Sequence, residues 1–257
     1  MRLQWDGLHN ARDLGGLALQ AGGRTPPGVY VRSDHPLHLT PEGWGQLADY
    51  GIHTIASLET AGLDGEAALR SNRPIELPHD LAVEVLRLPV EDAADQEFMG
   101  KWARTGLWGT PLYFADALQR WPRLYGDAIN ALALADGPVL FHCGRGHDRT
   151  GIVALLLLTL GGVRPEAIAE DYLLSSRNLE AQDPRSVQML ENALRDRGIT
   201  SYAAIAAAID VVDAKWLDRA SVRPDAIAAL RARFSPDATP SQLLVGVRSL
   251  RGLGQEW

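Results

Sequence analysis

The segment from Pro138 to Gly151 reads PVLFHCGRGHDRTG and is the most informative stretch of this 257-residue sequence. It begins with an apolar run that predicts a buried strand ending at His142. A turn containing Gly144 and Gly146 follows, and an apolar helix pattern extends from Thr150 to Leu160. A strand, a loop and a helix N-terminus in this order direct backbone N–H groups at one point, which suits a bound phosphate.

Outside this segment, short β-branched runs alternate with helical patterns, which favours an α/β fold. The expected strands cover Val29 to Arg32, His53 to Leu58, Val83 to Leu88 and Pro138 to His142. Thr40 and Pro41 predict the start of a helix, which Gly51 ends. The helical pattern over residues 111–135 contains Pro122, which is expected to open a second helix.

Almost the whole sequence after residue 164 has a helical pattern. The expected helices cover Pro165 to Ser176, Ser186 to Arg197, Tyr202 to Leu217, Pro224 to Phe234 and Ser241 to Arg251. Such a helical C-terminal half is expected to cover one side of the sheet. The sequence has no internal repeat and no Gly/Ser linker, so residues 1–257 are interpreted as one domain.

Composition restricts the class of protein. Apolar residues make up 46% of the chain and charged residues 22%, as in soluble globular proteins. The formal net charge of −7 argues against a nucleic-acid partner or an anionic membrane surface, because these attract an excess of Lys and Arg. The first ten residues contain no apolar signal core, and the run from Gly151 to Leu160 is too short to span a bilayer. We therefore expect a cytoplasmic protein without stable membrane insertion, with non-classical secretion left open.

Cys143 is the only cysteine, so it forms no internal disulfide and is a poor start for a zinc site. It is either an inert buried residue or a reactive thiol. A helix N-terminus and a nearby guanidinium both favour the nucleophilic thiolate. Arg149 follows after five residues and can bind two phosphate oxygens at once. This pattern predicts attack of Cys143 on phosphorus, with the charge stabilised by Arg149 and by the backbone of Gly144, Arg145, Gly146 and His147.

The stretch HCGRGHDRTG, residues 142–151, resembles the signature of the cysteine phosphatase superfamily: His-Cys, five residues, Arg, then Ser or Thr. NARDLGG (10–16), VRSD (31–34) and EDYLLS (170–175) resemble the bacterial branch of tyrosine phosphatases with a lipid-phosphatase-like loop. The resemblance implies a mainly parallel sheet flanked by helices and a cysteinyl-phosphate mechanism without metal or other cofactor. It also implies hydrolysis of phosphotyrosine, with phosphoserine, phosphothreonine or phosphoinositides accepted by some members.

Two departures from that family bear on the substrate. His147 stands where the family loop commonly has Lys, which speaks against phosphoinositide hydrolysis. IASLET, residues 55–60, replaces the usual Asp-Leu-Arg sequence at a strand end. The first hypothesis is therefore a protein tyrosine phosphatase acting on a phosphorylated protein or peptide. A phosphoinositide phosphatase is the alternative; a phosphate-binding pseudoenzyme is disfavoured, because Cys143 and Arg149 are both present.

The chemistry also needs a proton donor for the leaving oxygen. The resemblance suggests Asp148, whose alternative role is to stabilise the helix N-terminus, and Asp92 is the second candidate. Thr150 either eases the departure of the thiolate or caps the helix. His142 is expected to orient the loop through hydrogen bonds, and Asp13 belongs to a turn near the site.

The resemblance further suggests a helical lid over the phosphate loop, within residues 183–217. The sequence from Tyr202 to Leu217 is richer in small apolar residues than an exposed helix, so its broad face must pack on something. The alternative is permanent packing in the core. Asp171 and Tyr172 are candidates to brace the loop from the following helix, although a Tyr at helical spacing is more often an ordinary core residue.

Overall fold

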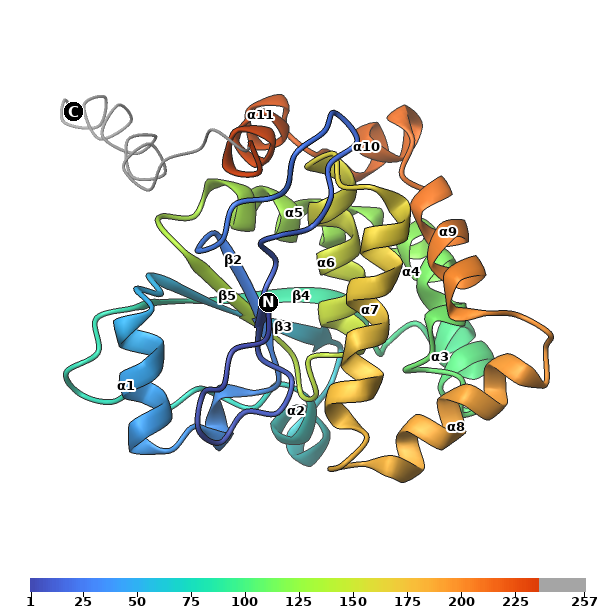
Figure 1. The fold of residues 1–257 in the computed structure, drawn as a ribbon. Helices are drawn as coiled ribbons and strands as arrows, with labels where there is room; N and C mark the ends of the chain where they lie inside the picture. The colour runs from blue at the N-terminus through green and yellow to red at the C-terminus, as the bar shows by residue number, and fades with distance from the viewer. Residues whose placement is uncertain (236–257) are drawn as a thin grey trace, which may run out of the picture.

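A computed structural model describes residues 1–235 of the chain. These residues form a five-stranded sheet in the order β1-β2-β5-β3-β4, with helices on both faces (Figure 1). The parallel strands are β2 (Tyr30–Ser33), β5 (Val139–His142), β3 (Thr54–Ala61) and β4 (Glu84–Asp92), and β1 (Arg12–Asp13) runs antiparallel to β2. The mainly parallel α/β sheet expected from the sequence is confirmed.

Alternating side chains of the sheet supply two separate hydrophobic cores. In β5, Val139 and Phe141 belong to the larger core and Leu140 to the smaller one. The larger core is covered by α4 (Phe114–Arg120), α5 (Pro122–Leu134), α6 (Asp148–Leu160) and α7 (Pro165–Leu179). The smaller core is closed by α1 (Pro41–Asp49) on the opposite face (Figure 1). β5 and the helix that follows it are therefore enclosed at the centre of the molecule.

Local sequence signals set several helix ends. Thr40 Oγ1 accepts a hydrogen bond from the Gly43 N–H at 3.2 Å, which caps α1 as predicted. Gly51 follows α1 with φ +80°, a conformation that favours glycine. Pro122 begins α5, and α6 is buried along nearly its whole length, both as expected.

The C-terminal part contains α8 (Pro184–Arg195), α9 (Ser201–Asp210), α10 (Ala214–Ala220) and α11 (Pro224–Arg233). The single helix expected over residues 202–217 is wrong. Asp213 interrupts it, because its carboxylate accepts a hydrogen bond from the Trp216 N–H at 2.7 Å and so caps a new helix. The helix expected over residues 241–251 lies outside the described residues.

Several short elements have no counterpart among the expectations. They are β1, α2 (Gly65–Ser71), α3 (Gln96–Trp102) and the 3₁₀ helix η1 (Pro36–His38), whereas a second 3₁₀ helix, η2 (Pro111–Tyr113), begins the helical pattern expected over residues 111–135. Each is too short for its hydrophobic period to be recognised in the sequence. Within residues 1–235, no helix combines the length and the apolar character that crossing a membrane requires.

Candidate active site

The loop of residues 143–147 connects the carboxyl end of β5 to the first turn of α6. Cys143 lies at its start and is 5% exposed. Gly146 has φ +66°, and a Cβ at this position would lie 2.3 Å from the carbonyl oxygen of Ser33. Glycine is therefore required where the loop crosses the end of β2.

Side chains from the N-terminal segment and β2 hold the outer side of this loop. Asn10 Nδ2 donates to the carbonyl oxygens of Arg145 at 3.0 Å and Gly146 at 3.1 Å. Arg32 Nη2 donates to the Gly146 carbonyl at 2.9 Å. In a trans peptide the N–H points opposite to the C=O, so these bonds turn the N–H groups of Gly146 and His147 toward the inner side. An anion can bind there.

A buried ion-pair network fixes Arg32 in turn. Asp171 of α7 accepts from Arg12 Nε at 2.7 Å and from Arg32 Nη1 at 2.6 Å. Burial alone would raise the pKa of Asp171, but the two guanidinium groups lower it to about 2. Asp171 thus braces the loop through Arg32, in the position that the sequence predicts.

Arg149 lies in the first turn of α6, where backbone carbonyls fix its side chain. Its Nη1 donates to the Leu58 carbonyl at 2.9 Å and to the Ser71 carbonyl at 3.4 Å. Burial works against the charged form, yet Coulombic interactions, of which those with Cys143 and Glu91 are the largest, raise the pKa of Arg149. The guanidinium is therefore charged and held in place before any ligand binds.

A hollow of about 230 Å³ opens beside this guanidinium. Three predicted site residues line it: Arg145, Asp148 and Arg149. Six residues that were not predicted line it as well: Thr60, Ser71, Glu91, Trp108, Gly109 and Tyr113. Of loop residues 143–147, Arg145 alone lines the hollow; Cys143, Gly144, Gly146 and His147 do not. The remaining lining comes from the first turn of α6, the ends of β3 and β4, α2 and residues 108–113.

Asp148 lies at the rim of this hollow. Its Oδ2 is 3.4 Å from Arg145 Nη2, and Arg145 Nη1 also contacts Asp183 Oδ2 at 3.1 Å. The second candidate acid, Asp92, does not line the hollow, and its Oδ1 accepts from the Ala94 N–H at 2.9 Å. In its place the preceding residue, Glu91, faces the hollow.

The two loop histidines are buried and uncharged. Burial lowers the pKa of His147 to about 4 and that of His142 to about 3. The His147 ring also stacks on Tyr172, with ring centroids 4.9 Å apart. Because its pKa is lowered, the His147 side chain brings no positive charge to the loop. His142 Nδ1 lies 3.2 Å from the Cys143 carbonyl oxygen, which places it at the start of the loop as expected.

Thr150 and Asp13 differ in their relation to the loop. Thr150 is fully buried in the first turn of α6, and its hydroxyl forms no hydrogen bond within residues 1–235. Helix capping, one of its two expected roles, is therefore wrong. Asp13 accepts hydrogen bonds from the Gly28 N–H at 2.7 Å and from the Tyr50 hydroxyl at 2.5 Å, so it fixes a turn beside β2.

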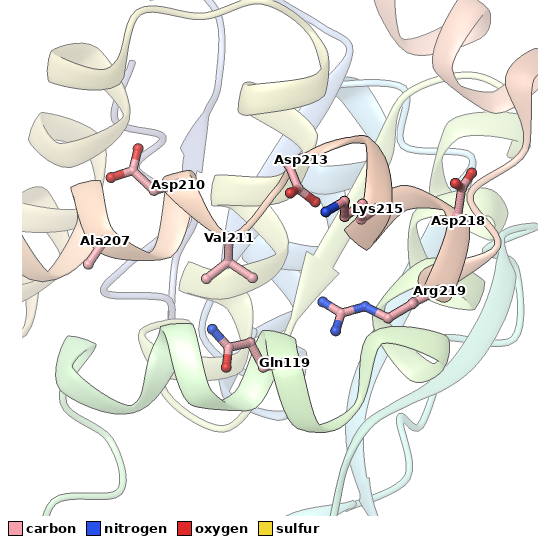
Figure 2. A pocket seen from close by; sticks show the side chains of 8 residues that line it. All are labelled: Gln119, Ala207, Asp210, Val211, Asp213, Lys215, Asp218 and Arg219. Carbon is pink, nitrogen blue, oxygen red and sulfur yellow. The ribbon is translucent and has the colours of Figure 1, made fainter.

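A second and larger hollow, of about 510 Å³, lies between α4, α9 and α10 (Figure 2). Three carboxylates and two cations line it: Asp210, Asp213, Asp218, Lys215 and Arg219. None of the predicted site residues lines it, and its positively and negatively charged side chains are mixed. The smaller hollow beside Arg149 is therefore the candidate active site.

Comparison with known proteins agrees with this geometry. The profile of the tyrosine phosphatase family matches residues 3–235. The chain belongs to the tyrosine phosphatase family. It is 30% identical to a putative tyrosine-protein phosphatase of Cupriavidus necator over 258 residues, 97% of this chain and 87% of that protein. It is also 28% identical to the triple specificity protein phosphatase PtpB of Mycobacterium tuberculosis over 190 residues, 64% of this chain and 67% of PtpB.

Family membership confirms the predicted class of enzyme, a phosphatase and hence a hydrolase. A shorter match, 54% identical over 50 residues or 20% of this chain, is to a tyrosine-protein phosphatase of Nostoc commune. Among the lining residues that sequence reasoning missed in this tyrosine phosphatase are Glu91, Trp108 and Tyr113. The strand expected from the sequence ended at Leu88, so its pattern did not indicate Glu91, although ligand-binding side chains of parallel sheets gather beyond the carboxyl ends of strands.

Proposed function

We propose that this chain hydrolyses phosphotyrosine in proteins or peptides, and also phosphoserine and phosphothreonine, through a cysteinyl-phosphate intermediate. One observation carries the proposal. Cys143 begins a loop whose outer carbonyls are bonded away from the site, while Arg149 lies in the first turn of the following helix. From this we infer that the thiol, the inward N–H groups and the guanidinium surround one anion-binding centre, an arrangement that phosphoryl transfer needs.

In the proposed reaction, the Cys143 thiolate attacks phosphorus and a sulfur–phosphorus bond forms while the bond to the ester oxygen breaks. Asp148 gives its proton to the departing oxygen, and Arg149 with the loop N–H groups stabilises the equatorial oxygens. Water then attacks phosphorus, Asp148 accepts the proton from this water, and the thiolate leaves. Phosphate is released and both side chains return to their starting states.

The charges of the site support a monophosphate rather than a polyphosphorylated headgroup. His147, at the position where a Lys would add a positive charge, is buried and neutral. Arg145 is the half-exposed cation at the rim, but Asp148 and Asp183 already pair with it. Phosphoinositides are the second candidate substrate, since Arg145 could exchange its carboxylate partners for a further phosphate group.

The test compares the wild-type protein with Cys143→Ser on phosphotyrosine, phosphoserine and phosphothreonine peptides and on soluble phosphoinositides. The wild type is expected to release phosphate from the phosphotyrosine peptide. Cys143→Ser is expected to bind vanadate without turnover, because a hydroxyl without a base is a much weaker nucleophile than a thiolate. Hydrolysis retained in Cys143→Ser would contradict the mechanism, and activity on phosphoinositides alone would overturn the substrate class.

A further inference from the structure

Glu91 reaches the candidate active site because of a β-bulge. In the pairing of β3 with β4, Glu59 lies opposite Pro89 and Thr60 lies opposite Glu91, so Val90 is the extra residue. A bulge breaks the in-out alternation of a strand and redirects the side chains that follow. Val90 and Glu91 are consecutive and both are buried, at 0% and 1% exposure. The bulge thus turns a carboxylate into the hollow beside Arg149.

Glu91 anchors two aromatic side chains of the same hollow. Its Oε1 accepts a hydrogen bond from the Tyr113 hydroxyl at 2.8 Å and one from Trp108 Nε1 at 3.4 Å. Tyr113 is fully buried, so its side chain is fixed in position. The Trp108 backbone N–H donates to the Trp102 carbonyl at 2.9 Å, so the main chain at Trp108 is held as well. The indole is therefore fixed both by its backbone and by its ring nitrogen.

The same segment passes directly beside Asp148. A Cβ at Gly109 would lie 3.5 Å from Asp148 Oδ2, so the backbone after Trp108 is in contact range of this carboxylate. In the proposed reaction Asp148 protonates the leaving oxygen. A group attached to that oxygen would therefore lie beside the segment of Trp108 and Gly109, and the Trp108 indole is a large apolar surface lining the same hollow.

We propose that Trp108, oriented by Glu91, is a specificity-determining residue that packs against the aromatic ring of an aryl phosphate monoester. This inference rests on the proposed function and names the structural cause of a preference for phosphotyrosine over alkyl phosphates. Aromatic pairs gain interaction beyond their buried area, equivalent to about two- to tenfold in affinity. A serine or inositol phosphate has no aromatic face and gains less from the indole.

The test measures kcat and KM for matched phosphotyrosine and phosphoserine peptides and for a soluble phosphoinositide. Trp108→Ala is expected to lower the ratio of kcat/KM for phosphotyrosine to that for phosphoserine by about two- to tenfold, chiefly through KM. Trp108→Phe keeps a ring but loses the bond to Glu91, so an intermediate ratio is expected. Trp44→Ala, in α1 against the smaller core, is the matched control and should leave the ratio at the wild-type value.

Glu91 is tested as a positioning residue by two substitutions. Glu91→Gln keeps an acceptor oxygen and should preserve the substrate ratio, whereas Glu91→Leu should lower it in the wild-type background but not in the Trp108→Phe background. An unchanged ratio in Trp108→Ala, or equal losses in Glu91→Gln and Glu91→Leu, would overturn the inference. If Glu91→Leu fails to fold, the substrate ratios of Trp108→Ala and Trp108→Phe still test the inference.

Failure of the inference can be told apart from failure of the proposed function. If Cys143→Ser abolishes turnover and Trp108→Ala leaves the ratio unchanged, the cysteine mechanism stands and the role of Trp108 is wrong. If Cys143→Ser retains turnover, the proposed function itself is wrong, whatever the Trp108 variants show.

Discussion

Asp148 has two roles consistent with its place at the start of α6: proton donor and helix-stabilising carboxylate. They differ in their dependence on the leaving group. Asp148→Asn is expected to slow hydrolysis of a phosphotyrosine peptide by roughly 10²- to 10⁴-fold, the usual contribution of general acid catalysis. An ester with an acidic leaving group, such as p-nitrophenyl phosphate, needs little protonation and should be affected much less.

The measurement is kcat/KM of Asp148→Asn and wild type on both substrates. Asp92→Asn is the matched control, since Asp92 lies one residue beyond Glu91 and does not line the hollow. Equal losses on the two esters would assign Asp148 to the helix terminus alone.

His147 makes the stability of the fold depend on pH. Burial lowers its pKa to about 4, whereas an unfolded chain has a histidine pKa of about 6.5. Its contribution to stability is therefore complete above pH 6.5 and is lost as pH falls toward 4, because the unfolded state takes up the proton first. The slope approaches about 1.4 kcal/mol per pH unit for one such group.

Urea unfolding of wild type and His147→Gln between pH 4.5 and 7.5 measures this slope. As pH falls, the free energy of unfolding of the variant is expected to decrease less steeply than that of the wild type. His142 contributes a pH dependence of the same sign in both proteins. Identical slopes would mean that His147 takes up its proton at the same pH in the folded and unfolded states, so that burial does not lower its pKa.

At the scale of secondary structure, α8 and α9 differ in how they are held. α9 buries Ala204, Ile205 and Ala208, whereas α8 buries only Leu190 and Leu194. We therefore expect permanent core packing for α9, and we propose that lid motion within residues 183–217 is restricted to α8. The N-terminus of α8 is tied to the phosphate loop, because Asp183 both caps the helix and contacts Arg145.

Hydrogen exchange should show this difference directly. Amides of α8 are expected to exchange faster than those of α9. A bound phosphate analogue should slow amide exchange in α8, because it contacts the loop that contains Arg145. Protection of α8 equal to that of the central helix α6, and unaffected by ligand, would show that the molecule has no mobile lid.

Some of these elements could be read from the sequence and others could not, for physical reasons. The four parallel strands contain short β-branched runs and α6 is a long apolar run, and both patterns depend only on local residues. The break between α9 and α10 was missed because apolar residues continue through Val211 and Val212, so that only the capping carboxylate of Asp213 marks it. The bulge at Val90 depends on pairing with β3, which no local pattern encodes, and this is why the sequence suggested Asp92 rather than Glu91.

At the scale of the whole molecule, the site is assembled from distant parts of the chain. Asn10, Arg32 and Asp171 all act on the loop after Cys143, and Glu91 and Trp108 complete the hollow. The final described helix is also integrated, since Arg233 donates to the Gly137 carbonyl at 3.1 Å and Phe234 packs on Tyr30. These contacts support our proposal that the chain forms one domain. The sequence identified the loop but could not show which remote side chains support it.

Metal removal tests the chemistry of this assembly as a whole. Arg149 and the loop N–H groups supply the positive charge that the proposed transition state requires, so EDTA is expected to leave kcat/KM unchanged. The comparison is activity before and after chelation, followed by addition of Mg²⁺, Mn²⁺ or Zn²⁺. Activity lost with EDTA and restored by one of these ions would contradict the proposed mechanism.

The covalent intermediate is the most direct test of the account. The enzyme is mixed with a phosphotyrosine peptide, quenched in acid within milliseconds and digested, and the peptide that contains Cys143 is examined by mass spectrometry. We expect one phosphoryl group on Cys143 of the wild type and none in Cys143→Ser. In Asp148→Asn the phosphorylated form should accumulate with p-nitrophenyl phosphate, whose leaving group needs no acid in the first step. A phosphoryl group on another residue, or turnover with Cys143 unmodified at every quench time, would contradict the account.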